Sequence, residues 1–151
     1  MRYHTALHLM SGAVHRRFGS GITGGQIAPD RARMDFSMPE FSREIAEGLI
    51  AEVNRVAATP LSVVVRQVSR AELQRDPSLV RVADELLPDV DPVRIVDIGG
   101  YDVQADGGTH VASTAELGPL RLERIENKGA RNKRLYVTLP REPDVRPAER
   151  L

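Results

Sequence analysis

The chain of 151 residues contains no cysteine and no tryptophan, and it has no long apolar run. Without cysteine there are no disulfides and no thiolates, so any metal site must use nitrogen and oxygen ligands. A membrane helix needs about 20 consecutive apolar residues, and the start of the chain lacks the regions that define a signal peptide. These absences predict a cytoplasmic protein with no membrane contact.

Charge is balanced overall but unevenly distributed. The 21 basic and 21 acidic residues give a net charge of zero, so there is no global attraction to nucleic acid. Between residues 121 and 134, however, the basic residues are opposed only by Glu123 and Glu126. From composition alone, a solvated strand face is the simpler interpretation. The basic residues of this strip are Arg121, Arg124, Lys128, Arg131, Lys133 and Arg134.

Hydrophobic periodicity predicts two main helices and a set of strands. Apolar residues recur at three- and four-residue spacing over residues 4–18 and 42–58, and Ser42 is a suitable N-cap for the second helix. Residues 19–27, GSGITGGQI, are typical of a flexible glycine-rich loop. A hairpin turn at Pro29-Asp30 follows this loop. Strands are predicted over residues 60–68, 93–98, 101–105, 119–125 and 133–139, with a short helix capped by Ser69 and Glu72.

This order of elements favours an α+β fold. We expect a single domain, residues 1–139, in which helices pack on a largely antiparallel β-sheet. Residues 140–151, PREPDVRPAERL, form a charged, proline-rich tail.

Two of the four histidines, His4 and His8, lie four residues apart in the first predicted helix. Side chains at this spacing project from one helix face, a single turn apart, and can hold one metal ion. The intervening residues, TAL, include no glutamate, so the general base of the HExxH metalloproteases is absent. The alternative is that His4 lies at a frayed terminus and His8 is a core histidine.

A second pair with the same spacing, Asp106 and His110, encloses Gly107 and Gly108. The glycines allow a tight turn that brings both side chains to one point. Two donors from a helix and two from a turn complete a tetrahedral set for zinc. Spacing alone leaves a second interpretation open, in which Asp106 merely caps a turn.

Four segments, in order along the chain, resemble the free-standing alanyl-tRNA editing proteins (the AlaX group). These proteins are similar to the editing domain of alanyl-tRNA synthetase. The segments are HTALHLM, GGQI followed by ARMDF, ADGGTHVASTAELGPLRL and ENKGARNKR. The resemblance extends from His4 to about Leu139, and it implies the editing-type fold of threonyl- and alanyl-tRNA synthetases.

The resemblance also implies a zinc ion held by an HxxxH pair and a CxxxH pair. His4, His8 and His110 match three of these ligands, and Asp106 stands where the family has cysteine. A carboxylate binds zinc at about 2.0–2.2 Å, so the altered set is chemically sound. Because a carboxylate is harder than a thiolate, it widens tolerance toward iron or manganese. We expect a bound divalent ion; a descendant that has lost its metal is the alternative.

By the same resemblance, the protein would hydrolyse in trans the ester bond of mischarged tRNA(Ala), chiefly seryl-tRNA(Ala). The substrate contacts implied are Thr23, Gly24, Gly25 and Asn132. The residues expected to meet phosphates of the tRNA acceptor end are Lys128, Arg131, Lys133 and Arg134. The alternatives are a metal-dependent hydrolase of another aminoacyl or acyl ester, and a metal-free RNA-binding descendant.

Overall fold

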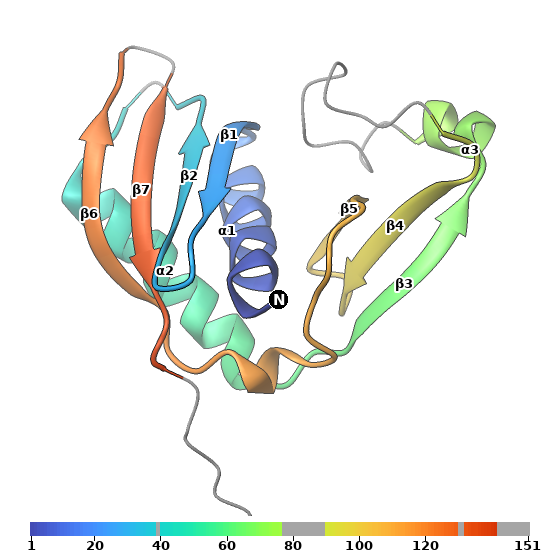
Figure 1. Cartoon of the computed structure of the whole chain (residues 1–151). Coiled ribbons are helices and arrows are strands. Elements are labelled where there is room, and N and C mark those ends of the chain that lie inside the picture. The colour runs from blue at the N-terminus through green and yellow to red at the C-terminus, as the bar shows by residue number, and fades with distance from the viewer. Residues whose placement is uncertain (39, 77–89, 130–131, 142–151) are drawn as a thin grey trace, which may run out of the picture.

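The computed structural model describes residues 1–38, 40–76, 90–129 and 132–141, and it contains two antiparallel sheets on either side of a long helix (Figure 1). The larger sheet has the strand order β1-β2-β7-β6, and the smaller has the order β3-β4-β5. The helices are α1 (Arg2–Phe18), α2 (Arg43–Ala58) and α3 (Arg70–Arg75). The strands are β1 (Ile22–Ile27), β2 (Ala32–Phe36), β3 (Val63–Val68), β4 (Val93–Ile98), β5 (Asp102–Ala105), β6 (Arg121–Asn127) and β7 (Lys133–Thr138).

The predicted α+β class is confirmed, but the strands are divided between two sheets rather than forming one. Helix α2 begins as expected, with the Ser42 hydroxyl accepting the Ile45 amide at 3.1 Å. None of the helices in the described residues is long and apolar enough to cross a membrane. Of the predicted tail, residues 142–151 lie outside the described residues, so this part stays a prediction.

The main core lies where α1 and α2 pack against the larger sheet. Alternate residues of the central strands point inward, among them Met34 and Phe36 of β2 and Leu135 of β7. Their outward neighbours are polar, as expected for a sheet with one solvated face. Leu9 and Leu49 complete this core from the two helices.

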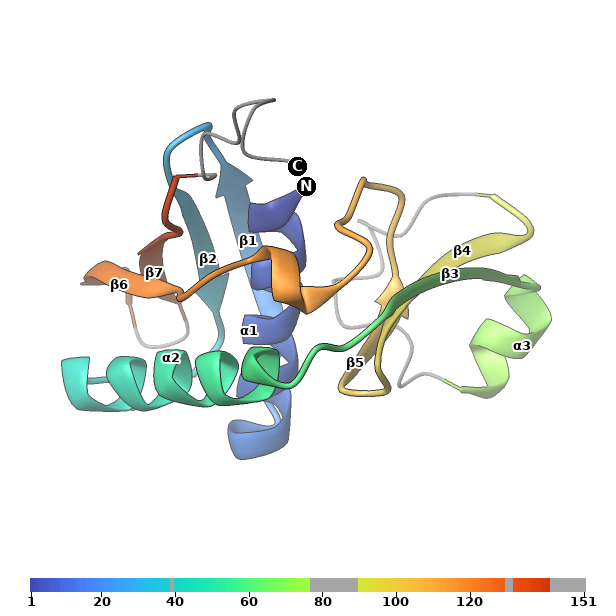
Figure 2. The same cartoon turned by 90° about the horizontal axis from the view of Figure 1, so that it is seen from below.

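The smaller sheet shares part of that core and is also tied to α1 by polar contacts. Val96 and Ile98 of β4 join the main core, whereas Val93 and Ile95 belong to a separate small cluster under α3. Arg16 of α1 donates to the carbonyl oxygens of the β4–β5 turn and stacks on the Tyr101 ring at 4.5 Å. Helix α1 therefore lies between the two sheets and contacts both (Figure 2).

The glycine-rich segment differs from its predicted form. Residues 22–27 are not a loop but an edge strand, β1, which pairs with β2. Pairing with a neighbouring strand outweighs the low strand propensity of its two glycines. The register shifts between Ile22 and Gly24, so Thr23 is the extra residue of a β-bulge. Bulges turn a side chain away from the regular alternation, and here the residue that is turned is Thr23.

Candidate metal centre

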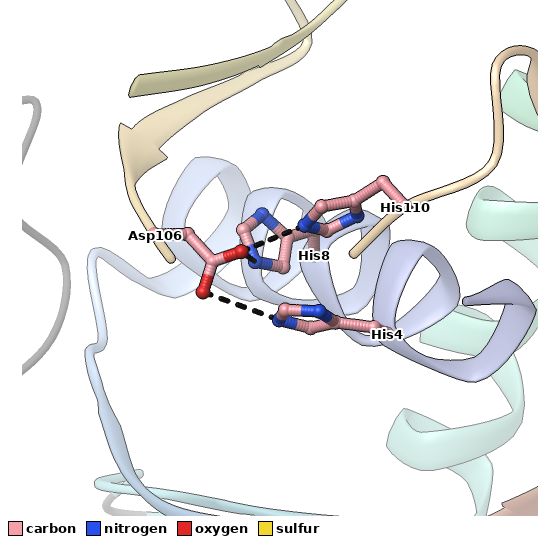
Figure 3. A group of neighbouring side chains, drawn as sticks. All are labelled: His4, His8, Asp106 and His110. Atoms are coloured by element: carbon pink, nitrogen blue, oxygen red, sulfur yellow. Dashed lines mark hydrogen bonds and ion pairs between the residues drawn. The ribbon is translucent and has the colours of Figure 1, made fainter. Parts of the chain in front are cut away.

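Four side chains from two distant segments meet beside α1. His4 and His8 project from one face of the helix, and Asp106 and His110 come from the loop that follows β5 (Figure 3). One nitrogen or oxygen atom from each residue lies within 4.8 Å of the others. The structure therefore brings together the four residues singled out by spacing, in an arrangement that could hold a metal ion.

The distances inside the cluster suit a small divalent cation. The Asp106 carboxylate lies 3.3 Å from Nε2 of His4, 3.7 Å from Nε2 of His8 and 2.8 Å from Nε2 of His110. Bonds of about 2.0–2.1 Å in a tetrahedral zinc site place neighbouring ligand atoms about 3.3–3.5 Å apart. The three carboxylate–histidine spacings bracket this value, whereas the four ligand atoms as a set lie within 4.8 Å of one another, so a bound metal would draw the donors closer together.

The back of each imidazole is held by a hydrogen-bond acceptor. Nδ1 of His4 lies 3.1 Å from the Thr109 carbonyl oxygen, which only accepts, so this nitrogen donates. Nδ1 of His8 lies 3.1 Å from the Asp102 carboxylate and donates to it in the same way. In both rings the assigned tautomer leaves Nε2 facing the cluster.

The third imidazole, His110, is held by a hydroxyl. Its Nδ1 lies 2.9 Å from Oγ1 of Thr5, which also accepts the Val111 amide at 3.2 Å. The Thr5 hydroxyl can donate to the Met1 carbonyl at 3.2 Å, which leaves its oxygen free to accept from His110. All three histidines therefore present Nε2 to the same point, as metal-binding histidines require.

Protonation within the cluster also suits metal binding. Burial alone would raise the pKa of Asp106, but the contacts with His110 and His4 and the positive charges of His4 and His8 hold it well below its ordinary value. Burial lowers the pKa of His110, and the hydrogen bond to Asp106 only partly offsets this. An ionised carboxylate and a neutral imidazole are the forms that bind metal.

The cluster is open on one side. The His110 and His8 side chains are 2% and 7% exposed, whereas His4 and Asp106 are 23% and 20% exposed. A ligand can therefore approach past His4 and Asp106.

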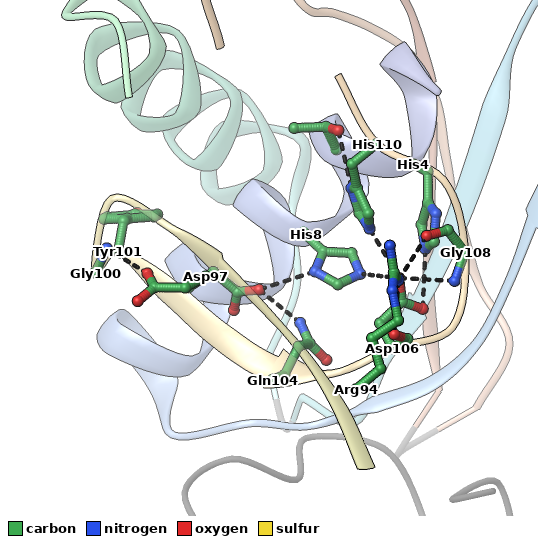
Figure 4. Close-up of polar contacts among 12 residues, drawn as sticks. His4, His8, Arg94, Asp97, Gly100, Tyr101, Gln104, Asp106, Gly108 and His110 are labelled. Carbon is green, nitrogen blue, oxygen red and sulfur yellow. Dashed lines mark hydrogen bonds and ion pairs between the residues drawn. The ribbon is translucent and has the colours of Figure 1, made fainter. Parts of the chain in front are cut away.

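The loop that carries Asp106 is held by contacts that the sequence did not reveal. Nη1 of Arg94 donates to the carbonyl oxygens of Asp106 at 2.9 Å and Gly108 at 2.8 Å (Figure 4). A Cβ added at Gly108 would lie 2.6 Å from Nδ1 of His4, whereas one at Gly107 would meet nothing within 4 Å. Neither glycine has a positive φ. Gly108 is therefore needed for close approach to His4 rather than for a left-handed turn.

Two of the expected substrate residues also meet. The Thr23 hydroxyl donates to Oδ1 of Asn132 at 2.9 Å, across the end of the larger sheet. Gly24 lies against Asp35, so that an added Cβ would be 3.2 Å from the carboxylate, and Gly25 lies against the Arg33 carbonyl oxygen. Thr23 and Gly25 are exposed, and Gly24 and Asn132 are partly exposed.

The basic strip is largely engaged in contacts within the chain. Nζ of Lys133 is buried and donates to Oδ1 of Asn127 at 2.8 Å and to the Gly129 carbonyl at 2.7 Å. Arg134 makes a two-fold contact with Asp35 at 2.8 and 3.0 Å. Lys128 is 46% exposed and pairs with Glu126. Arg131 lies outside the described residues.

Two further polar residues near the cluster escaped the sequence analysis. Asp102 and Gln104 are 0% and 2% exposed on β5, while Val103 between them is partly exposed. An alternating DVQA strand would ordinarily bury its valine and expose its polar residues. The sequence alone could not predict that this strand buries its polar residues, because the polar neighbours on α1 are known only from the fold.

The chain is similar in sequence to several known proteins. Residues 93–136 match the family described as the threonyl and alanyl tRNA synthetase second additional domain. The chain is 38% identical over 139 residues to the alanyl-tRNA editing protein AlaX-M of Saccharolobus solfataricus, covering 92% of this chain and 58% of the relative. It is 35% identical over 140 residues to the AlaX-M protein of Methanosarcina acetivorans, covering 92% and 57%. It is also 33% identical over 129 residues to the alanine–tRNA ligase of Hyperthermus butylicus, covering 83% and 14%.

Residues 93–136 of the chain thus resemble an additional domain of the kind found in threonyl- and alanyl-tRNA synthetases. The chain is a homologue of the AlaX-M alanyl-tRNA editing proteins, and it spans just under three fifths of the length of those relatives.

Proposed function

We propose that this chain hydrolyses the ester bond of mischarged tRNA(Ala), chiefly seryl-tRNA(Ala), in trans. The observation that carries the proposal is the convergence of His4, His8, Asp106 and His110, with every imidazole fixed from behind. The similarity to AlaX-M proteins over 92% of the chain supports the same substrate class.

The four residues would hold one divalent ion, with zinc as the expected metal. When bound, such an ion polarises an ester carbonyl and lowers the pKa of water. The contribution of the chain is to fix the donors: each Nδ1–H bond sets a ring orientation, and Arg94 holds the loop that carries Asp106. The open side past His4 and Asp106 is where the ester would enter.

Thr23 and Asn132 would recognise the amino acid. Because the Thr23 hydroxyl donates its proton to Asn132, its oxygen remains able to accept a hydrogen bond from a serine hydroxyl. Alanine has no hydroxyl and would leave that acceptor unpaired, so the correctly charged tRNA is spared. Gly24 and Gly25 add no side chain beside this pair, which leaves room for the substrate.

The partner is the acceptor end of a charged tRNA, met in the cytoplasm. Among Lys128, Lys133 and Arg134, which the structure describes, Lys128 is the best placed to meet a phosphate. It would have to give up only a single surface ion pair, the one with Glu126. Lys133 and Arg134 would act indirectly, by holding the hairpin between β6 and β7 and the outer face of the sheet.

The direct test is deacylation of seryl-tRNA(Ala) and alanyl-tRNA(Ala) by the purified chain. We expect hydrolysis of the seryl ester only, its loss in chelator, recovery with added zinc, and loss in His110→Ala. His15→Ala is the matched control, because His15 is exposed on the same helix, away from the cluster. Seryl-tRNA hydrolysis that survives both the chelator and His110→Ala would overturn the proposal.

A further inference from the structure

We propose that Asp102, held in place by Gln104, is a positioning residue that orients His8 and supplies a second negative charge to the metal centre. This inference rests on the proposed metal site. It concerns two buried residues of β5.

The three histidines are not held by equivalent acceptors. His4 donates to a backbone carbonyl and His110 contacts a hydroxyl, and both of these acceptors are neutral. The acceptor behind His8 is a carboxylate, at 3.1 Å, with no exposed surface. A carboxylate behind a histidine raises the basicity of its other nitrogen, so His8 becomes the strongest nitrogen donor of the three.

Gln104 fixes the carboxylate that does this. Its amide nitrogen donates at 2.7 Å to Oδ2 of Asp102, the same oxygen that accepts from Nδ1 of His8. Two donors converging on one buried oxygen restrict the rotation of the carboxylate. Gln104 therefore sets the direction from which His8 is held.

The charges around the cluster call for a second carboxylate. A divalent cation adds two positive charges, and the Arg94 guanidinium lies against the backbone of the same loop. Among the four ligands, only Asp106 carries a negative charge. Asp102 adds a second negative charge directly behind His8. Because Asp102 is fully buried, water screens this charge only weakly.

A purely structural role does not explain this residue well. Burying a carboxylate has a desolvation cost, and apolar side chains of similar volume usually stabilise a core at least as well. Asp102 nevertheless lies at the contact between β5 and α1, beside the main core. The cost is offset when a cation binds on the other side of His8.

The test measures metal affinity directly, without activity. Dissociation constants for Zn²⁺ and Co²⁺ are obtained by competition with a chromophoric chelator, using the full chain. Asp102→Asn keeps the shape but removes the charge, and we expect its affinity to fall about 10- to 100-fold. Asp102→Ala, which also removes the acceptor, should lose more. Gln104→Met, which keeps the charge and loses the amide donor, should lose less.

Asp97→Asn is the matched control. Asp97 lies on the same β4–β5 hairpin, and its carboxylate accepts the Gly100 amide at 2.8 Å instead of a histidine. We expect its metal affinity to equal that of the wild type. If Asp97→Asn loses as much affinity as Asp102→Asn, the effect belongs to the hairpin and the inference is wrong.

The absorption spectrum of the Co²⁺ form gives a second readout. At saturating Co²⁺, the visible bands should shift in Asp102→Asn and Gln104→Met because His8 is reoriented, and stay unchanged in Asp97→Asn. If Asp102→Asn does not fold, as judged by circular dichroism, Gln104→Met decides. Wild-type affinity and an unshifted spectrum in Gln104→Met, or in a folded Asp102→Asn, overturn the inference and leave the proposed function intact. A wild-type chain that binds no metal overturns both.

Discussion

The cluster of His4, His8, Asp106 and His110 differs from the Thr23–Asn132 pair in burial and in the number of supporting contacts. Every imidazole of the cluster is held by a second contact behind the ring, and two of the three are almost fully buried. Thr23 is exposed at a bulge in an edge strand, and its hydroxyl contacts Asn132, which precedes β7. The first region is fixed by its surroundings, and the second is formed by two partly or fully exposed residues.

This difference agrees with the role proposed for each region. Metal ligands must hold their distances within a few tenths of an ångström, and this requires buried, hydrogen-bonded side chains. Recognition of an amino acid side chain needs one well-directed hydroxyl and open space around it, which an edge strand with two glycines provides. Changes to the cluster should therefore alter metal binding, whereas changes around Thr23 should alter hydrolysis of the seryl ester without altering metal binding.

The largest effect is expected from Gly108→Ala. The added methyl group would lie 2.6 Å from Nδ1 of His4, a distance that forces the ring out of the cluster. We expect the metal affinity to fall by more than about 100-fold, since a ligand and its outer contact are lost together. Isothermal titration with Zn²⁺ measures this.

Gly107→Ala is the neighbouring control. A Cβ at this position meets no atom within 4 Å, and its φ is not positive. Its affinity should remain within a few-fold of the wild type. Equal losses in the two variants would show that loop flexibility, rather than contact with His4, explains the need for glycine.

Asp106→Cys tests the chemistry of the fourth ligand. A thiolate is a softer donor than a carboxylate, so this variant should bind Zn²⁺ at least as tightly as the wild type and bind Mn²⁺ and Fe²⁺ more weakly. Competition among these metals, followed by elemental analysis, measures the change in preference. If the wild type already excludes Mn²⁺ and Fe²⁺ as strongly as Asp106→Cys, the carboxylate does not set the metal preference.

Thr23→Val removes the hydroxyl but keeps the shape of the side chain. We expect kcat/KM for seryl-tRNA(Ala) to fall about 10- to 100-fold, because a hydrogen bond to the substrate is lost. The metal affinity should not change, and Thr23→Ser should restore most of the activity. Deacylation rates and zinc titrations on the same samples separate the two regions. A fall in zinc affinity would contradict the separation.

The sequence predicted the cluster better than its support. Helical spacing placed His4 and His8 together, and the resemblance joined them to Asp106 and His110. The acceptors Thr5, Asp102 and the Thr109 carbonyl were not predicted, because hydrogen bonds between α1 and the β5 region depend on tertiary packing that local patterns do not encode. Only the folded structure shows these three contacts.

Strand β1 was missed for a related reason. Its glycines favour a loop when only local propensity is considered, and strand propensity depends strongly on neighbouring strands. Pairing with β2 makes it a strand. The bulge at Thr23 could not be inferred either, since a register shift appears only once both strands are aligned. The sequence thus identifies the side chains that can bind a metal. It does not show which other residues contact them in the folded chain.

The smallest effect on the metal centre is expected from Asp35→Asn, which should affect stability alone. Asp35 is buried on β2 and accepts from both Arg134 and Arg33. Burial raises its pKa, but the two guanidinium groups outweigh burial and lower the pKa below its ordinary value. A carboxyl whose pKa is lower in the folded state stabilises the fold above its unfolded-state pKa of about 3.9, and this contribution is lost as the pH falls through the folded-state value.

At pH 7 the variant should therefore lose about 2 kcal/mol of free energy of unfolding. The difference from the wild type should begin to narrow below about pH 4, where Asp35 of the unfolded chain takes up a proton, and it should close only below the lowered folded-state pKa. Urea unfolding in chelator across this pH range measures the gap, and zinc titration at pH 7 should show unchanged affinity. A gap of constant size at every pH would mean that Asp35 acts through its shape, and a weaker zinc affinity would mean that the outer face of the larger sheet and the metal cluster are coupled.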